Sequence, residues 1–301
     1  MSSALMDDSH HVLYEGPERE PVPSVALWRD PLWMLPRAFI VPALQQLSMW
    51  AGYEWSPLVA FGAYFVGLVG FFTMTASRFN RLGKKYGMYN QEERGRDRIP
   101  DESVDIMGEG ILWYFTWRVG CLVWNFYDQG VNPVDNFSWS YIVRWQLWFI
   151  VMDYFFYCYH RGTHEVDFLW RIHAYHHKSK HPTMAHAVLS NHAQHFLEIM
   201  IIPTLATYVV PLTFHEQFVL YLCLAHIETM GHTGIRIHAA NPNTWMSTIP
   251  FGMDLTIEDH DLHHRFGKSG KNYGKMTRVW DKIFGTMEHR VESHAAKHKY
   301  F

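Results

Sequence analysis

Apolar stretches recur along the chain at lengths that suit membrane helices. The clearest covers residues 57–76, twenty residues without a charged side chain, which is about the length needed to cross the core of a bilayer. The stretch 32–50 is interrupted by Pro36, Arg37 and Pro42, so we expect it either to span with a kink or to lie in the interface. The pattern predicts helices, at least one of them transmembrane.

Two further blocks, 106–127 and 139–159, are rich in Trp, Tyr and Phe. This composition is typical of membrane interfaces and also of an aromatic core. Arg144 lies near the start of its block and is expected to extend outward to water. Arg118 lies nearer the middle of its block, so it needs a partner or water.

Two shorter apolar runs, 196–212 and 218–230, predict a helical hairpin that dips into the bilayer, since each is marginal as a full span. The segment 77–98 carries seven Lys and Arg residues and should therefore be cytosolic. Counting crossings from it places every large histidine group on the cytosolic side. The expected fold is all-α: an integral membrane helical bundle of about four spans plus the hairpin, with a cytosolic histidine-rich cap.

The composition narrows the class of protein. Charged residues make up 18% of the chain and the formal net charge is -3, which excludes a disordered chain and a nucleic-acid-binding protein. Cys121, Cys158 and Cys223 all lie in apolar stretches, so neither a disulfide scaffold nor a Cys-based zinc site is expected. The first thirty residues are polar and acidic, and no cleavable signal peptide is expected there. Histidine stands out, with 21 of 301 residues.

Three histidine clusters have the spacing of metal ligands: HRGTH, HAYHH and HDLHH. Residues three or four apart lie on one face of a helix, so each cluster can direct two or three imidazoles at one point. One cluster alone is weak evidence, but three of them beside expected membrane exits indicate a shared site. Their eight imidazoles suit two ions better than one. The eight residues are His160, His164, His173, His176, His177, His260, His263 and His264.

Additional ligands are expected where the hairpin enters and returns. His195 and His232 are predicted to complete the two coordination spheres, and His192 is undecided. Glu198 and Glu228 either orient imidazole N–H groups or face water. Four histidines stay open between polar packing and support of the site: His181, His186, His226 and His238. Six are expected to be exposed: His10, His11, His215, His289, His294 and His298.

The donor set suggests redox chemistry rather than structural metal binding. Imidazole binds zinc, copper, iron and nickel alike, and structural zinc sites close with four ligands that often include thiolates. A two-metal site beside a membrane suggests the oxidation of a lipid-like substrate. Zinc is redox-inert, whereas iron activated by O2 can break an unactivated C–H bond.

In this order, HRGTH, HAYHH and EDHDLHH resemble the fatty acid hydroxylase/sterol desaturase superfamily of membrane di-iron oxidases. Asp153, the run HHKSKHPTMAHAVLSNHAQHFLE and the ending NYGKMTRVWDKIFGT support the resemblance, which covers about residues 140–290. Phe196 stands where the family often has proline.

The resemblance implies a cofactor of two Fe ions, with O2 as co-substrate and electrons from NAD(P)H through a separate donor. Cytochrome b5 and its reductase are the partners it implies, and no cytochrome b5 haem motif occurs in the chain. The implied reaction is hydroxylation, or desaturation, of a sterol, a fatty acyl or sphingoid chain, or a specialised hydrophobic metabolite. The implied location is the endoplasmic reticulum membrane, multi-pass, and Lys297 and Lys299 have the spacing of a weak retrieval signal for it.

Three regions are predicted: a polar cytosolic N-terminal segment (1–30), a membrane-embedded catalytic domain (31–290) and a C-terminal tail (291–301). Two alternatives stay open, an aldehyde decarbonylase of the same superfamily and a non-catalytic zinc-binding membrane carrier. A catalytically inactive scaffold is a third, less favoured. Arg161 is expected to contact Asp153, a lipid head group or water, and the role of Asp261 is undecided.

Overall fold

The computed structural model describes residues 20–89 and 96–293. Every regular element in these residues is a helix, and the β-type contacts are isolated bridges such as Met88–Ile235. The all-α prediction is confirmed for this part of the chain.

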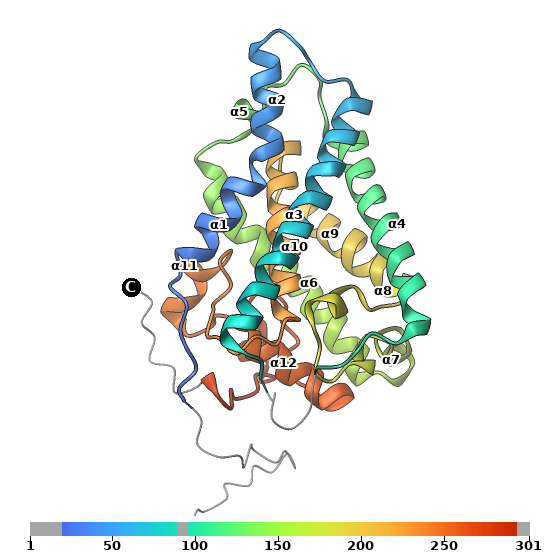
Figure 1. Cartoon of the computed structure of the whole chain (residues 1–301), viewed down its shortest axis with the longest axis vertical. Helices are drawn as coiled ribbons and strands as arrows, with labels where there is room; N and C mark the ends of the chain where they lie inside the picture. Colours follow the sequence, from blue (N-terminus) through green and yellow to red (C-terminus); the bar gives the residue numbers. More distant parts are fainter. Residues whose placement is uncertain (1–19, 90–95, 294–301) are drawn as a thin grey trace, which may run out of the picture.

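Four long helices run roughly along the long axis of the molecule (Figure 1): α3 (Pro57–Tyr86), α4 (Asp101–Phe126), α6 (Ser140–Glu165) and α10 (Phe214–Gly231). The N-terminal helices α1 (Arg29–Ala38) and α2 (Ile40–Trp50) lie beside them. The remaining helices are short: α5 (Pro133–Asn136), α7 (Asp167–His173), η1 (His176–Lys178), η2 (Met184–Val188), α8 (His192–His195), the π-helix η3 (Phe196–Ile201), α9 (Ile202–Val209), α11 (Trp245–Thr248), η4 (Ile249–Phe251), α12 (Ile257–Phe266), η5 (Gly267–Ser269) and α13 (Val279–Phe284).

Helix α10 lies at the centre of two hydrophobic clusters. On one side, Leu220 belongs to a cluster with Trp148 and Phe149 of α6. On the other side, Phe218 belongs to a cluster with Tyr64 of α3. The centroids of the Tyr64 and Phe218 rings are 4.6 Å apart in an edge-on contact, a favoured aromatic geometry. Because α10 joins both clusters, its C-terminal end is held firmly where the histidines gather.

The apolar block 32–50 is interrupted, as its prolines predict. Helix α1 ends at Ala38 and α2 begins at Ile40, with Phe39 between them. Pro36 lies two residues before the end of α1. A proline in a helix removes one backbone donor and disfavours continuation, which accounts for the break.

Both apolar runs of the predicted hairpin are helical, as η3 with α9 and then as α10, but α10 begins earlier than its apolar run. Helix α10 begins at Phe214 because Thr213 caps it: the Thr213 hydroxyl accepts from the Glu216 amide, and a Glu216 carboxylate oxygen accepts from the Thr213 amide at 3.0 Å. This capping box recruits polar residues into the first turn. Arg144 joins it, with Nη1 at 2.8 Å from Glu216 Oε2, so Arg144 is ion-paired rather than free in water.

One described helix, α3, is long and apolar enough to cross a membrane, with a mean hydropathy of 1.8 over its most apolar stretch. Helices α4 and α6 have the length, but charged and aromatic side chains lower their hydropathy. On α4, Trp113 and Trp124 are largely exposed. The arrangement of about four spans remains a prediction.

Candidate metal centre

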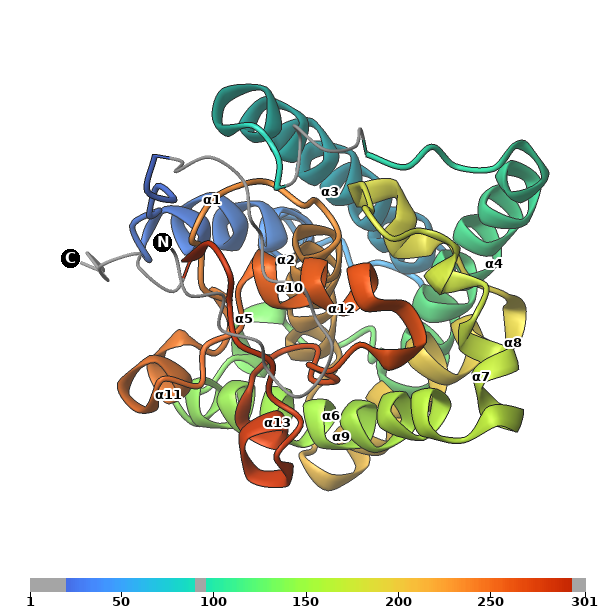
Figure 2. The same ribbon diagram turned by 90° about the horizontal axis from the view of Figure 1, so that it is seen from below.

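The predicted ligands gather at one end of the bundle. Figure 1 shows α7 and α12 at this end, and Figure 2 looks onto it, with α12 close to the end of α10. The C-terminal part of α6 also reaches this end and packs against α7. Three regions far apart in the sequence, residues 160–177, the end of α10 and α12, therefore bring their histidines together.

Nine of the ten predicted ligands form two compact, buried groups, and in each group one candidate ligand atom per residue lies within 4.8 Å of all the others. The first group contains His160, His164, His173, His177 and His263. The second group contains His176, His232, His260 and His264. The groups adjoin, since the ring centroids of His177 and His264 are 4.7 Å apart.

Each of the two HxxHH motifs divides its histidines between the groups. In α12, His260 and His264 lie four residues apart on one face and join the second group, whereas His263 points to the first. The other motif is not one helix: α7 ends at His173, and a 3₁₀ turn carries His176 and His177. Adjacent residues on a helical turn point in different directions, so one motif can supply both groups.

Neighbouring rings face one another through their Nε2 atoms. Five pairs of Nε2 atoms lie 2.9–3.1 Å apart: His160–His173, His173–His177, His177–His263, His176–His232 and His232–His260. The Nε2 atoms of His164 and His264 are buried and have no hydrogen-bond partner. The ring nitrogens of both groups thus converge without protein donors to satisfy them.

The opposite ring nitrogen fixes the tautomer. The Nδ1 of His176 lies 2.9 Å from the carbonyl oxygen of Leu189, and the Nδ1 of His232 lies 2.8 Å from that of Glu228. A carbonyl only accepts, so each Nδ1 must carry the proton and each Nε2 a lone pair. Two lone pairs 3.1 Å apart then face each other, an arrangement that a cation between them would stabilise.

The spacing also fits a metal ion. Two nitrogens at right angles, each about 2.1 Å from one ion, lie about 3.0 Å apart, and the Nε2 pairs lie 2.9–3.1 Å apart. Nine neutral imidazoles exceed what one ion coordinates. The residues therefore fit two ions, one in each group.

Burial keeps the rings neutral. It lowers the pKa of His264 to about 3 and that of His164 to about 4. The pKa of His176 is lowered well below its usual value by burial and by the neighbouring imidazoles. Because metal ligation requires the neutral ring, these side chains are prepared to bind a cation at neutral pH.

A close backbone contact positions His263. Its Nδ1 lies 2.8 Å from the Lys271 carbonyl oxygen, in the loop after α12. A Cβ on Gly270 would lie 2.4 Å from the His263 carbonyl oxygen, so only glycine permits this approach. Asn272 adopts a left-handed conformation (φ 63°) and donates its side-chain amide to the Asp259 carbonyl at 3.0 Å. The turn thus packs the loop closely against α12, which carries three of the candidate ligands.

Asp153 fastens the closing motif to α6. Its fully buried carboxylate accepts from the backbone amides of Lys275, Met276 and Thr277 at 2.7, 2.7 and 3.1 Å. Of the three alternatives for Arg161, contact with Asp153 is the one that the described contacts contradict, because Arg161 pairs with Glu165, one turn along the helix, at 2.8 Å. Asp153 instead fixes the loop whose Tyr273 carbonyl accepts from His160 Nδ1 at 2.8 Å.

His195 is the predicted ligand that joins neither group. Its ring packs against Tyr114, with 4.7 Å between centroids, and a Cβ on Gly110 would lie 2.9 Å from it. It lies on the side of α8 that faces α4 and an adjoining cavity. His192 is exposed and is also absent from both groups.

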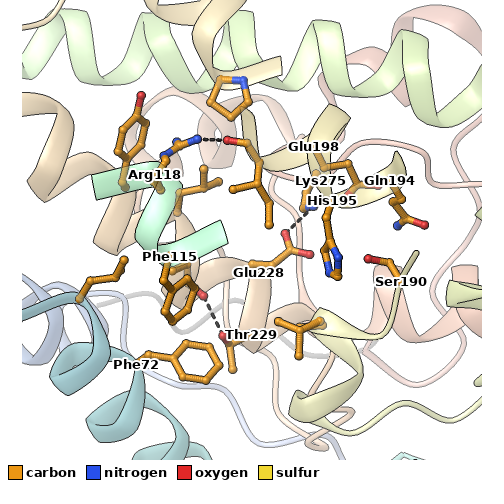
Figure 3. A pocket seen from close by; sticks show the side chains of 18 of the residues that line it. Phe72, Phe115, Arg118, Ser190, Gln194, His195, Glu198, Glu228, Thr229 and Lys275 are labelled. Atoms are coloured by element: carbon orange, nitrogen blue, oxygen red, sulfur yellow. Dashed lines mark hydrogen bonds and ion pairs between the residues drawn. The ribbon is translucent and has the colours of Figure 1, made fainter. Parts of the chain in front are cut away.

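That cavity has a volume of about 130 Å³ (Figure 3), and one of its lining residues, Glu228, contacts His232 of the second histidine group. Its wall is apolar along α3, α4 and α10, with Leu68, Phe72, Phe115 and Leu224 among the lining residues. Polar residues line the other parts: Arg118, Ser190, Gln194, His195, Glu198, Glu228 and Lys275. It suits a substrate that is mostly apolar and carries one polar group.

Glu198 and Glu228 are each expected either to orient an imidazole N–H group or to face water, but the main contact of both carboxylates is an ion pair. Glu198 and Glu228 both pair with Lys275, at 3.1 and 2.7 Å. Glu228 contacts His232 through its main-chain oxygen, with its carboxylate 3.8 Å from the ring nitrogen. The only feature of the sequence that pointed to Lys275 is its position in the closing motif NYGKMTRVWDKIFGT.

Asp261 pairs with Arg96 at 2.6 Å, and Arg96 also donates to the Gly234 carbonyl at 2.6 Å. Arg96 thereby ties the segment before α4 to α12 and to the loop after α10. Sequence reasoning missed this role, since Arg96 differed in no visible way from the other basic residues of its segment.

All four undecided histidines are buried: His181, His186, His226 and His238. The ring of His226 packs between Trp33 and Phe79, with centroids at 5.5 and 4.9 Å. The Nδ1 of His186 accepts from the Thr183 amide at 3.0 Å and caps a turn. These two are structural residues, and neither joins the metal-ligand groups.

The prediction that His215 is exposed is wrong. It is buried, with Nδ1 at 2.8 Å from Asn136 Oδ1, because the Thr213 cap brings it into the first turn of α10. His289 is exposed as predicted. Four others lie outside the described residues: His10, His11, His294 and His298.

Comparison with known proteins agrees with the site. Residues 145–286, which contain every residue of both histidine groups, match the fatty acid hydroxylase family model. This part of the chain therefore resembles the fatty acid hydroxylase family. The superfamily resemblance read from the three clusters is thereby confirmed.

Two kinds of curated protein are similar to this chain. The fatty acid hydroxylase vlmA of Lecanicillium sp is 34% identical over 225 residues, which is 70% of this chain and 61% of that protein. Alkylglycerol monooxygenase of Homo sapiens is 29% identical over 159 residues, 51% of this chain and 32% of that protein. The chain thus spans less than two thirds of either relative. No solved structure matches it significantly.

Proposed function

We propose that the protein is an O2-dependent di-iron oxidase that hydroxylates a lipid-like substrate. The observation that carries the proposal is the pair of buried histidine groups, whose Nε2 lone pairs converge beside an apolar cavity. Resemblance to the fatty acid hydroxylase family, whose named relatives include hydroxylases and monooxygenases, supports the same reaction class.

The ten sequence-predicted ligands reduce to nine in this proposal. The first ion is held by the five-histidine group and the second by the four-histidine group, while His195 lines the cavity. When bound, the irons supply the O2 activation that attack on an unactivated C–H bond requires. The balanced reaction is RH + O2 + 2 e⁻ + 2 H⁺ → ROH + H2O.

The chain's own groups orient and shield this chemistry. Main-chain carbonyls hold the imidazoles in one tautomer, as Tyr273 does for His160 and Lys271 for His263. The apolar wall formed by Phe72 and Phe115 excludes water from the substrate. Water exclusion protects a reactive oxidant from side reactions.

The electrons and the location belong to the same proposal. The two electrons come from NAD(P)H through a separate donor, cytochrome b5 with its reductase. The protein is a multi-pass membrane protein of the endoplasmic reticulum, with the histidine groups on the cytosolic side. The apolar helix α3 and the basic residues that follow its apolar part support this orientation.

Isotope labelling tests the reaction class. Full-length protein in native membranes, with NAD(P)H and the donor system, is incubated under ¹⁸O2 and its lipids are compared by mass spectrometry with those of an H176A variant. The expected result is one ¹⁸O atom in a hydroxylated lipid, present with wild type and with an H192A control and absent with H176A.

Other outcomes identify the alternatives. A hydrocarbon one carbon shorter than its aldehyde precursor would indicate a decarbonylase. Bound zinc without oxygen uptake would indicate the carrier. Either result would overturn the proposed hydroxylation.

A further inference from the structure

Two cavities meet at one side chain of α4. The inner cavity is lined in part by Glu228, which contacts His232 of the second histidine group, and an outer cavity of about 500 Å³ lies between α4 and α9, where Asn125, Phe126 and Tyr208 reach the molecular surface. The two cavities share two lining residues, Arg118 and Tyr221. A substrate that moves from the outer to the inner cavity must pass this pair.

Arg118 is a cation without an anionic partner. Its guanidinium donates to the main-chain oxygen of Ile199 and lies 3.4 Å from the centroid of the Tyr221 ring. In the described part of the chain it forms no ion pair with an acidic side chain, unlike Arg144, which pairs with Glu216. A charge removed from bulk water without a counter-ion is costly, so this position favours an anion in the cavity.

The other charged residues of the inner cavity are already engaged. Lys275 pairs with Glu198 and Glu228, and Glu228 lies next to His232 of the second group. In Figure 3 this polar cluster lies on the opposite side of the cavity from Arg118. The cavity thus has a lone cation at its entrance and the metal centre beyond its far side.

The chemistry of this entrance selects a carboxylate. One guanidinium balances one negative charge and matches the two oxygens of a carboxylate. A phosphate would bring up to two charges, with no second free cation among the described residues that line the inner cavity. Tyr221 and Ile199 provide apolar surface for the carbons next to the carboxylate.

We propose that Arg118 binds the carboxylate of an acidic lipid substrate at the junction of the two cavities and so sets which carbon reaches the metal centre. This inference rests on the proposed function for the identity of the reaction, but not for the binding itself. The substrate class is a long-chain carboxylic acid with a free, ionised head group. The position of oxidation is then counted from the carboxylate rather than from the methyl end.

Binding tests the inference without turnover. Full-length protein in nanodiscs, kept free of oxygen, is titrated with the fluorescent cis-parinaric acid and with its methyl ester, at a pH where the acid is ionised. Wild type should bind the acid about tenfold more tightly than the ester, as loss of one charge-assisted contact predicts. The R118Q and R118M variants should bind both about equally, and the R118K variant should keep part of the preference.

R81Q provides the matched control, since Arg81 is exposed and its guanidinium donates to the Ser77 carbonyl of its own helix. It should keep the wild-type preference. Equal binding of acid and ester by wild type, or an unchanged preference in both R118Q and R118M, would overturn the inference. Retained ester binding shows that a variant has kept its cavity, and R118M preserves side-chain bulk if R118Q does not fold.

The two proposals fail separately. Acid-selective binding by a protein that never hydroxylates would leave the Arg118 site intact and overturn the function. Hydroxylation by a protein that binds the acid and the ester equally would overturn the Arg118 site and leave the proposed function intact. Where turnover occurs, saturated acids of different lengths should be oxidised at a constant number of bonds from the carboxylate, and R118Q should scatter the position.

Discussion

At the scale of single residues, most of the imidazoles are oriented by an ordinary backbone contact. Six of the nine rings place Nδ1 2.8–3.1 Å from a main-chain carbonyl: His160, His164, His176, His232, His263 and His264. A carbonyl cannot donate, so Nε2 is left with the lone pair in each ring. The ligand set is therefore neutral and pre-oriented.

The division into two groups predicts a stepwise loss of metal. His264 belongs to the four-membered group and its Nε2 has no protein partner. Replacing it in H264A should lower the iron content from about two to about one ion per chain, because the five-histidine group stays complete. Metal analysis of the purified protein measures this. H192A removes an exposed imidazole and should change nothing. A loss of iron that is equal in H264A and H192A would argue against separate groups.

Asp153 should be a stability determinant. In D153A, three buried amides lose their acceptor, which should lower the free energy of unfolding by about 3 kcal/mol. Chemical denaturation of the detergent-solubilised protein measures it. Asp105 is exposed on α4, so D105A should stay within about 0.5 kcal/mol of wild type. If D153A had the same free energy of unfolding as wild type, the closing loop would be held by other contacts.

At the scale of elements, α12 is the helix on which the centre depends most. It supplies His260, His263 and His264. Charges hold it from outside: Arg290 pairs with Asp259 at 2.8 Å, and Arg96 pairs with Asp261 at 2.6 Å. Its orientation thus depends on segments both early and late in the chain.

The turn after α12 offers a test of this dependence. In G270A, the new methyl group would meet the His263 carbonyl at 2.4 Å, and relief of this overlap should cost about 1–3 kcal/mol. It should also weaken iron retention, since His263 would move. Denaturation and metal analysis measure the two effects. A Cβ on Gly62 of α3 meets nothing within 4 Å, so G62A should be neutral or stabilising by up to about 1 kcal/mol. If G270A and G62A had the same stability and the same iron content, the close contact between position 270 and the His263 carbonyl would be refuted.

Sequence spacing predicted much of this because helical periodicity is a local property. It predicted a helix in the block 139–159 and one shared helical face for His160 and His164, and α6 contains both. It could not reveal the end of α7 at His173, where a 3₁₀ turn sends His176 and His177 to different groups. Likewise, the amides that meet Asp153 are more than 120 residues away in sequence, and no local pattern encodes such a contact.

At the scale of the whole molecule, burial of so many imidazoles links folding to pH. Burial lowers the pKa of His164 to about 4 and of His264 to about 3 in the folded protein, against about 6.5 in an unfolded chain. Below about pH 6.5 the histidines of the unfolded chain therefore bind protons that the buried histidines of the native state do not bind. Acidification favours unfolding.

The metal-free protein should therefore lose stability between about pH 7.5 and about pH 5, by about 1 kcal/mol per pH unit for each such histidine. Urea denaturation of chelator-treated protein measures the trend. Stability that is unchanged or higher at the acidic end would show that these rings are not held neutral. Bound metal should raise stability at neutral pH and lose this effect on acidification.

The whole arrangement also explains where sequence reasoning went wrong. His195 lies beside the clusters in sequence, yet its ring packs on Tyr114 of α4, a contact that depends on how distant helices pack. His215 is predicted to be exposed, but the cap at Thr213 places it in the first turn of α10, where it is buried. In both cases tertiary packing decided what composition could not.

The central claim is that two adjacent groups of neutral imidazoles hold two ions. Iron quantification together with X-ray absorption at the iron edge, on full-length protein purified from cells supplied with iron, tests it most directly. We expect about two irons per chain, coordinated mainly by nitrogen at about 2.1 Å. One iron or none per chain, or a coordination sphere dominated by oxygen or sulfur, would contradict it.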